Sequence, residues 1–238
     1  VYIYHSGFAL EADGFSILID YFKDSDPDPA KGYVRSELLK RAGTLYILAS
    51  HFHPDHFNKE VLQWREQRPD IIYIFSKDIL RHRRAQKEDA VWLKKGEEYK
   101  DETLSVRAFG STDVGVSFLL QAGGKKIFHA GDLNNWHWMD ESTEAEWKGA
   151  EKNFLHELDD LYAYTPEVDV AMFPVDPRLG KEYMRGAGQF VTKIKTHIFV
   201  PMHFTPEYAK ANAFRDFAEA HGVRFVSLTH RGQKIEIE

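Results

Sequence analysis

The chain has 238 residues, 43% of them hydrophobic, a formal net charge of −6 and no cysteine. This length can bury a large core and fits one domain over 1–238, while the missing cysteine excludes disulfides and thiolate metal ligands. The acidic balance argues against a broadly basic nucleic-acid surface, and no apolar run approaches the roughly 20 residues of a membrane span. We therefore expect a cytoplasmic protein that acts on a small molecule and binds neither nucleic acid nor membrane; its oligomeric state stays open.

Short runs of β-branched and aromatic residues predict strands, and apolar residues at helical spacing predict helices. The predicted strands are 1–9, 14–21, 45–49, 71–75, 103–109, 115–121, 125–130, 168–173, 197–201, 224–228 and 234–237. The predicted helices are 34–42, 58–67, 77–84, 144–163, 181–194 and 206–221. Periodicity by itself indicates only a mixed α and β chain.

The densest cluster of potential metal ligands follows the predicted strand 45–49, where an HxHxDH motif runs from His51 to His56. Alternate side chains of an extended segment share a face, so His51 and His53 can bind one metal together. The proline after them turns the chain, so that Asp55 and His56 point toward a second metal or toward the other side of the same one. The motif predicts a metal site with one or two ions.

This motif resembles the signature of the metallo-β-lactamase superfamily, and later segments resemble the family's other landmarks in the right order. The segment 126–132 is similar to the strand that ends in an aspartate bridging two metals, which implies that role for Asp132. The segment 198–204 is similar to the strand that precedes the last histidine ligand, which implies that role for His203.

The opening segments 2–8 and 15–21 resemble the first hairpin of the family, where Asp20 takes the place of a structural carboxylate beneath the metals. The resemblance covers nearly the whole chain and implies an α+β fold, the four-layer αββα sandwich. His5 is not assigned as a ligand, because a lone histidine in a strand is more often structural. His129 is expected to point away from the site.

The chain departs from the family pattern at one ligand. The family supplies a third histidine to the first metal from a turn before a strand, but no histidine occurs between His82 and His129. Ser111 or Thr112 aligns with that point, and the carboxylate of the neighbouring Asp113 is a better ligand than either hydroxyl. We predict Asp113 as the replacement; the alternative is that it only fixes a turn.

The predicted first site thus consists of His51, His53, Asp113 and a share of Asp132. The second site consists of Asp55, His56, Asp132 and His203. These nitrogen and oxygen ligands suit zinc first, with manganese or iron as alternatives.

The segment after Asp132 carries the predicted substrate-binding residues, because its side chains start near the metals. Trp136 and Trp138 suit an aromatic wall and His137 a proton carrier or anion contact, unless the tryptophans only dock the helix 144–163 onto the core. Further along the chain, Asp176, Arg178 and Arg185 are second-rank pocket candidates, and Arg185 is predicted to bind substrate; the alternative for an arginine is a surface salt bridge.

The predicted activity is metal-assisted hydrolysis, in which a metal-bound hydroxide attacks an ester, lactone, amide or phosphodiester and Asp55 and Asp132 are catalytic. The opening and closing motifs look most like the group of metal-dependent hydrolases that includes sugar-lactone lactonases. The alternative is a non-catalytic descendant that keeps metal for structure or sensing. A redox diiron protein of this fold would normally have a glutamate in place of His53, and a nuclease would need a basic groove.

Overall fold

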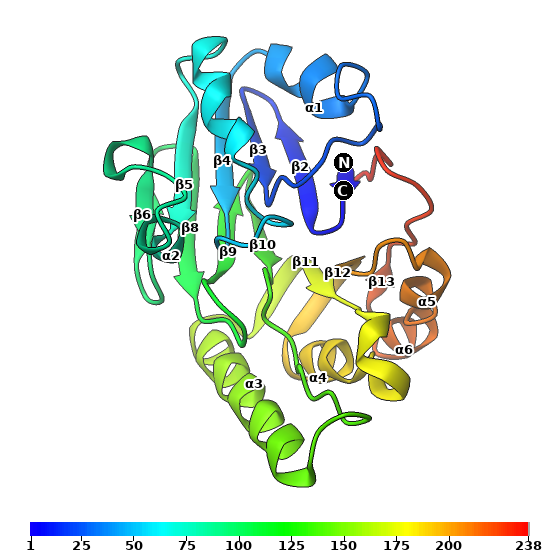
Figure 1. Cartoon of the computed structure of the whole chain (residues 1–238). Coiled ribbons are helices and arrows are strands. Elements are labelled where there is room, and N and C mark those ends of the chain that lie inside the picture. Colours follow the sequence, from blue (N-terminus) through cyan, green and yellow to red (C-terminus); the bar gives the residue numbers. More distant parts are fainter. Residues whose placement is uncertain (238) are drawn as a thin grey trace.

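The computed structural model describes residues 1–237, which form two mixed β-sheets with helices on the outer sides (Figure 1). The first sheet has the strand order β1-β2-β3-β4-β5-β6. Its strands are β1 (Tyr2–Tyr4), β2 (Gly7–Ala12), β3 (Phe15–Ile19), β4 (Thr44–Ala49), β5 (Ile72–Ser76) and β6 (Val91–Leu93).

The second sheet has the strand order β13-β12-β11-β10-β9-β8-β7. Its strands are β7 (Glu98–Lys100), β8 (Leu104–Phe109), β9 (Ser117–Ala122), β10 (Lys125–His129), β11 (Glu167–Pro174), β12 (Lys195–Met202) and β13 (Arg224–Phe225). Each sheet starts with antiparallel strands and continues with parallel ones, from β3 to β6 and from β10 to β13. Loops after parallel strands leave from one edge of a sheet, and ligands commonly bind there.

Helices cover the outer face of each sheet. On the first sheet these are α1 (Tyr33–Ser36), α2 (Lys77–Arg81) and the 3-10 segments Leu38–Lys40 and Lys59–Glu66, which share an apolar cluster with the strands. On the second sheet they are α3 (Glu144–Tyr164), α4 (Arg185–Lys193), α5 (Tyr208–Asn212) and α6 (Arg215–Ala220). This is the α+β, four-layer αββα sandwich that the sequence predicts.

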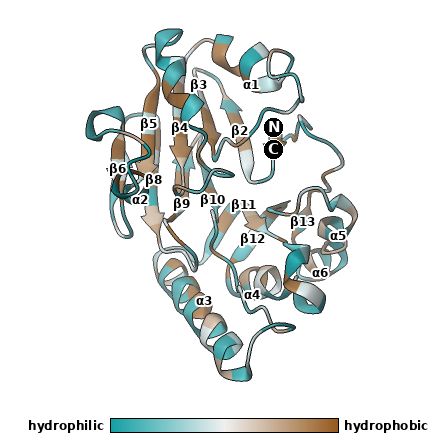
Figure 2. Cartoon of the chain, in the orientation of Figure 1, coloured by the Kyte–Doolittle hydropathy of each residue, from teal (hydrophilic) through white to brown (hydrophobic). Residues whose placement is uncertain are grey.

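The central strand β4 is buried on both faces. Tyr46 and Leu48 belong to the apolar cluster that joins the two sheets, whereas Leu45 and Ile47 belong to the cluster beneath the helices. A strand that is covered on both faces has apolar residues at consecutive positions, as the segment 45–49 does. Figure 2 shows the same contrast, with apolar strands at the centre and mixed helix surfaces outside.

Several predicted elements differ in extent. The predicted strand 1–9 is interrupted at His5, whose backbone φ of 58° makes the turn between β1 and β2. The short strands β6 and β7 were not predicted, because three residues are too few to show alternation. The predicted strand 234–237 is not assigned as a strand over its described residues 234–237; its apolar side chains pack on the core without pairing in either sheet.

The predicted helices also changed in length and type. The predicted helix 58–67 is a 3-10 segment capped by Asn58, which accepts a hydrogen bond from the Glu60 amide. The predicted helix 206–221 is broken into α5 and α6, and the helix predicted at 181–194 starts only at Arg185, after the 3-10 segment Pro177–Glu182. These boundaries depend on tertiary contacts that periodicity does not contain.

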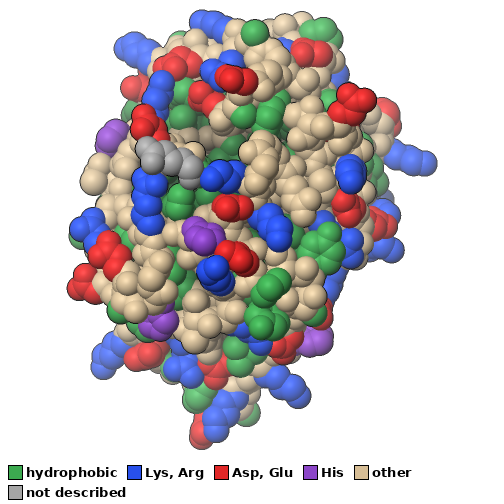
Figure 3. Space-filling view, turned by 180° about the vertical axis from the view of Figure 1, so that it is seen from behind, with side chains coloured by type: hydrophobic (Ala, Val, Ile, Leu, Met, Phe, Trp, Pro, Cys, Tyr) green, Lys and Arg blue, Asp and Glu red, His purple; other side chains and the backbone are tan. Residues whose placement is uncertain are grey.

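On the face shown in Figure 3, positively and negatively charged side chains are interspersed and do not gather into a block of one sign. This face therefore has no basic patch of the kind that binds a polyanion such as nucleic acid. Among the described residues, no helix combines the length and the apolarity needed to cross a bilayer.

Replacing Phe128 by Ala tests the core beneath the second sheet. Phe128 is fully buried, and its ring stacks on that of Phe190 with 5.5 Å between centroids. Its removal leaves a cavity and should lower the free energy of unfolding by about 3–5 kcal/mol, measured by denaturant titration. Tyr162→Ala, at a half-exposed side chain of α3, serves as the control and should change it by no more than about 0.5 kcal/mol. Equal losses in the two variants would contradict this packing.

Candidate metal centre

Three side chains from two loops form a first group of potential ligands. His51 and His53 come from the loop after β4, and Asp132 comes from the loop after β10. The His51 Nε2 atom lies 3.1 Å from His53 Nδ1 and 3.2 Å from Asp132 Oδ2. One atom of each residue lies within 4.8 Å of the others, which is close enough to share one ion.

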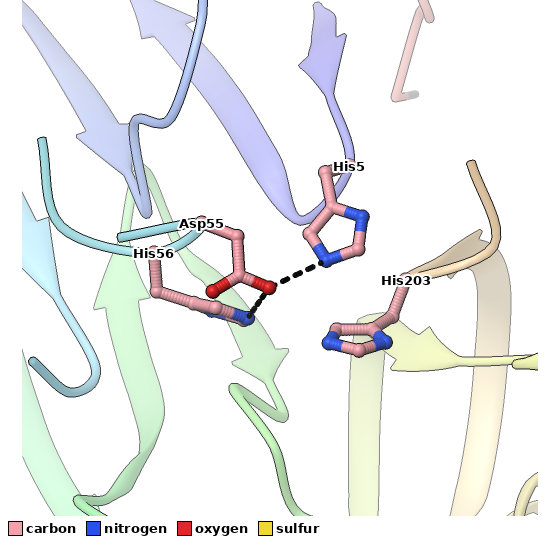
Figure 4. A group of neighbouring side chains, drawn as sticks. All are labelled: His5, Asp55, His56 and His203. Carbon is pink, nitrogen blue, oxygen red and sulfur yellow. Dashed lines mark ion pairs between the residues drawn. The ribbon is translucent and has the colours of Figure 1, made fainter. Parts of the chain in front are cut away.

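A second group lies on the other side of Asp132. Its Oδ1 atom is 3.0 Å from His56 Nε2 and 3.3 Å from His203 Nε2. His5, Asp55, His56 and His203 bring one ligand atom each within 4.8 Å of one another (Figure 4). The two oxygens of Asp132 therefore face two separate groups, the arrangement required of a bridging carboxylate.

Asp20 orients two histidines of the HxHxDH motif, His56 directly and His51 through Ser50. It is fully buried after β3, and its Oδ2 atom accepts hydrogen bonds from His56 Nδ1 at 2.7 Å and from the Ser50 hydroxyl at 2.7 Å. The Ser50 hydroxyl in turn lies 3.0 Å from His51 Nδ1. Because the Nδ1 atoms are engaged in this way, the Nε2 atoms of His51 and His56 are left to bind a cation.

His203 is oriented in the same manner from the second sheet. Its Nδ1 atom lies 2.9 Å from Asp176 Oδ2, which follows β11, and Asp176 also pairs with Arg178. Burial alone would raise the pKa of Asp176, but hydrogen bonds from His203 and Arg178 lower it to about 2. The carboxylate therefore stays ionised and keeps the Nε2 atom of His203 directed toward Asp132.

Buried carboxylates make positive charge favourable at this centre. Burial would lower the pKa of His203, but the Asp132 carboxylate raises it to about 9, and Asp132 and Asp20 together raise the pKa of His56 well above its usual value. Burial would raise the pKa of Asp132, yet His56 and His203 hold it well below its usual range. The same field that holds protons here favours a divalent cation, which would displace them.

Three buried polar atoms support a shared cation more directly. His5 Nε2, His56 Nε2 and Asp132 Oδ1 have no hydrogen-bond partner among the described residues, although each is shielded from solvent. Buried polar atoms are rarely left unsatisfied, since each would cost about 1–3 kcal/mol. The residues present therefore fit a metal ion, and their nitrogen and oxygen atoms suit zinc, manganese or iron(II).

Two glycines let neighbouring loops approach the motif. Gly115 and Gly131 have φ values of 75° and 54°, a region that favours glycine. A Cβ atom on Gly115 would lie 2.2 Å from the Ser50 carbonyl oxygen, and one on Gly131 would lie 2.9 Å from Ser50 Cβ. Close backbone packing around Ser50 thus brings the loops after β8 and β10 against the motif.

The turn that lacks the expected histidine places Asp113 beside His53. The Asp113 Oδ2 atom lies 3.6 Å from His53 Nδ1, but the carboxylate is exposed and does not belong to the first group of His51, His53 and Asp132. The Thr112 hydroxyl is engaged by the backbone of Asn134, and Ser111 Oγ accepts a long hydrogen bond from the Asp113 amide. Of the three candidates, Asp113 is the one whose side chain faces a ligand; its binding of metal stays a prediction.

A hollow of about 330 Å³ opens over Asp132. Trp136 and Trp138 line it, and their rings are nearly parallel, with 15° between planes and 6.4 Å between centroids. Trp136 Nε1 donates a hydrogen bond to the Asp132 carbonyl oxygen, which fixes the wall beside the bridging residue. Asp55, His53 and Arg178 line other sides.

Two of the predicted substrate-binding residues, His137 and Arg185, do not line this hollow. His137 is buried; its Nε2 atom donates to the Glu182 carbonyl and its Nδ1 accepts from the Met139 amide. Arg185, at the start of α4, is turned toward α3, where its Nε donates to Glu151 at 2.7 Å. Both residues are used for structure.

Two histidines that were not predicted as ligands, His129 and His5, differ in their position relative to the centre. His129 lies behind the centre, where its Nε2 donates to the Ser6 carbonyl and its Nδ1 accepts from the Gly131 amide. His5, by contrast, belongs to the second ligand group. In the sequence it is a lone histidine within the first predicted strand, which is a common and uninformative position.

Comparisons with known proteins agree with this fold. Residues 1–147 match the family model described as a β-lactamase superfamily domain. The chain is 26% identical to a "UPF0173 metal-dependent hydrolase" of Symbiobacterium thermophilum over 85% of this chain and 82% of the relative. It is 23% identical to a protein of the same name from Carboxydothermus hydrogenoformans, over 92% and 91% of the two chains.

Solved structures give the same result. Igni18, described as a metallo hydrolase of the archaeon Ignicoccus hospitalis, superposes with a TM-score of 0.67 at 19% identity and covers 99% of this chain and 96% of its own. CmlA, a diiron β-hydroxylase of Streptomyces venezuelae, has a TM-score of 0.63 at 14% identity, over 97% of this chain but 52% of its own. At these identities the likeness concerns the fold alone.

Replacing Asp20 by Asn tests the role of the buried carboxylate. The amide NH₂ would donate toward His56 Nδ1, so that the proton would move to Nε2 and block the nitrogen that faces Asp132. We expect zinc affinity to fall by about 10–100-fold in a competition titration with a chromophoric chelator. Asp13→Asn, on the exposed end of the same hairpin, should bind zinc as the unmodified protein does. Equal affinities for the two variants would contradict this role.

Proposed function

This chain belongs to the β-lactamase superfamily, and from that membership and the geometry of the centre we propose that it is a metal-dependent hydrolase of a small anionic molecule. The observation that carries the proposal is the position of Asp132, whose two carboxylate oxygens face two groups of histidines beneath an open hollow. The bond cleaved is an ester, lactone or phosphodiester.

The residues that would hold the metals come from four loops. The first group supplies His51, His53 and Asp132, with Asp113 at its open edge, and the second supplies Asp55, His56, His203 and the other oxygen of Asp132. The chemistry supplied by bound metal is activation of water at neutral pH and stabilisation of the oxyanion that develops on the substrate. Zinc is the proposed metal, with manganese or iron(II) as alternatives.

Asp55 is proposed to orient the attacking water. Its carboxylate is partly exposed, lines the hollow and lies 4.0 Å from His56 Nε2. Burial would raise the pKa of Asp55, but His5 and His56 hold it well below its usual range, so the group is ionised and accepts a hydrogen bond from water at neutral pH. With the nucleophile drawn from water, no serine or cysteine nucleophile is needed.

The walls of the hollow support an anionic substrate. Trp136 and Trp138 offer a flat apolar wall for the body of the molecule. Arg178 lines the hollow with a side chain that is 64% exposed, while its Nε atom is fixed by Asp176. A planar guanidinium held in place suits a carboxylate or phosphate group on the substrate.

The alternative function is a metal-binding protein without catalysis. The observation that favours it is the turn 111–113, where the family's third histidine is absent and Asp113 lies outside the closest ligand group. The two functions differ in what the loss of Asp132 does to hydrolysis.

Replacing Asp132 by Ala tests catalysis. Because both ligand groups lose a carboxylate, we expect hydrolysis to fall by at least about 100-fold, measured with nitrophenyl phosphodiesters, nitrophenyl esters and lactones at saturating zinc or manganese. Asp13→Ala should leave the rates unchanged. If the unmodified protein and Asp132→Ala showed the same background rates on every substrate, the non-catalytic alternative would be favoured.

Replacing Arg178 by Gln tests recognition of the anionic group. Loss of a hydrogen-bonded charge costs about 1.5–3 kcal/mol, so we expect KM for an anionic substrate to rise about 10-fold or more, with partial rescue by Arg178→Lys. KM for a neutral ester should change little. Arg185→Gln is the matched control, because that arginine pairs with Glu151 outside the hollow. A larger rise in KM in Arg185→Gln than in Arg178→Gln would contradict the assignment of Arg178 to the anionic group.

A further inference from the structure

We propose that His5 is a ligand of the second metal position and that this position is the tighter of the two in this chain. The inference rests on the metal centre of the proposed function, but it concerns metal binding and does not depend on hydrolysis. Its basis is the buried Nε2 atom of His5, which has no hydrogen-bond partner among the described residues, and the place of that atom in the second ligand group.

The backbone of His5 is fixed at the turn between β1 and β2. Its amide donates to the Tyr2 hydroxyl at 3.0 Å, and its carbonyl accepts from the His203 amide at 3.2 Å. His5 and His203 both have positive φ values, 58° and 62°, which non-glycine residues seldom adopt. The turn is thus tied directly to the residue after β12, and strained residues of this kind cluster at functional sites.

The side chain of His5 points into the second group. In Figure 4 its ring faces the space between Asp55, His56 and His203. The Nε2 atom lies 3.3 Å from Asp55 Oδ2 without forming a hydrogen bond, and the ring centroid is 4.2 Å from that of His203. A nitrogen that is buried, lacks a hydrogen-bond partner and lies close to three other ligand atoms is placed for a cation.

The other ring nitrogen of His5 is consistent with this role. Its Nδ1 atom lies 3.4 Å from the Thr205 hydroxyl oxygen. If Nδ1–H donates to Thr205, the lone pair of Nε2 is directed at the group, as the Nε2 lone pairs of His56 and His203 are when Asp20 and Asp176 hold their Nδ1 atoms.

With His5 included, the two positions become unequal. The second position has three imidazoles, the Asp55 carboxylate and a share of Asp132, whereas the first has two imidazoles, a share of Asp132 and the exposed Asp113. More nitrogen ligands in a buried site favour tighter binding of zinc or cobalt. His5 thus adds an imidazole on one side of Asp132, while the turn 111–113 lacks one on the other side. When metal is added, the position formed with His5 should fill before the position formed with His51 and His53.

The test is a cobalt(II) titration of metal-free protein, followed by visible absorption and by metal content per chain. We expect His5→Ala to lower the affinity for the first cobalt ion bound at least about 10-fold and to change the visible bands of that ion. His53→Ala should lower only the affinity for the cobalt ion that binds second. His230→Ala, at an exposed histidine, is the control. His5→Gln separates ligation from positioning of Asp55, because the amide can donate to Asp55 but is a poor metal ligand.

First-ion affinity and bands that stay unchanged in His5→Ala, or that His5→Gln restores, would overturn the inference. Should the variants fail to fold, scalar coupling between bound cadmium and the His5 Nε2 atom of the unmodified, nitrogen-labelled protein decides the question: coupling supports ligation and its absence refutes it. If these measurements exclude His5 as a ligand, the proposal of a hydrolase is unaffected. If the protein hydrolyses none of the substrates tested, the assignment of His5 as a ligand is likewise unaffected.

Discussion

The geometry of the centre depends on one buried charge, the carboxylate of Asp20. It lies under the loop after β4, accepts hydrogen bonds from the Ser50 amide and hydroxyl and from His56, and is fully shielded from solvent. An ionised group in such a place is tolerated only when its oxygens are satisfied. Here the partners that satisfy it are the residues that carry the ligands, so stabilising the charge and orienting the imidazoles are the same interaction.

The two halves of the sandwich meet the centre in similar ways. From the first sheet, Asp20 orients His56 through Nδ1; from the second, Asp176 orients His203 through Nδ1. In both cases a carboxylate after one parallel strand fixes an imidazole after its neighbour. Asp132 lies between the two halves, and its position makes the centre a property of the interface between the sheets.

Much of this centre could be predicted from residue order, because the HxHxDH motif is local: its ligands are close in sequence and the strand before it fixes their direction. Asp132 and His203 could be proposed only through resemblance to a family. His5 could not, because its imidazole reaches the group through a backbone contact between residues 5 and 203. Similarly, the sequence did not show that His137 and Arg185 lie away from the hollow, because their partners, Glu182 and Glu151, come from other elements.

The sequence by itself determined the mixed α and β character of the chain and the HxHxDH motif, because periodicity and ligand spacing are local properties. The sandwich architecture and the missing histidine at 111–113 could be predicted only through resemblance to a family. Only the tertiary structure decided which side chains share a site. The loops after β4, β8, β10 and β12 meet at Asp132, and their directions depend on buried hydrogen bonds and on the close backbone approach at Gly115. Those interactions join residues far apart in the chain, and no local pattern in the sequence encodes them.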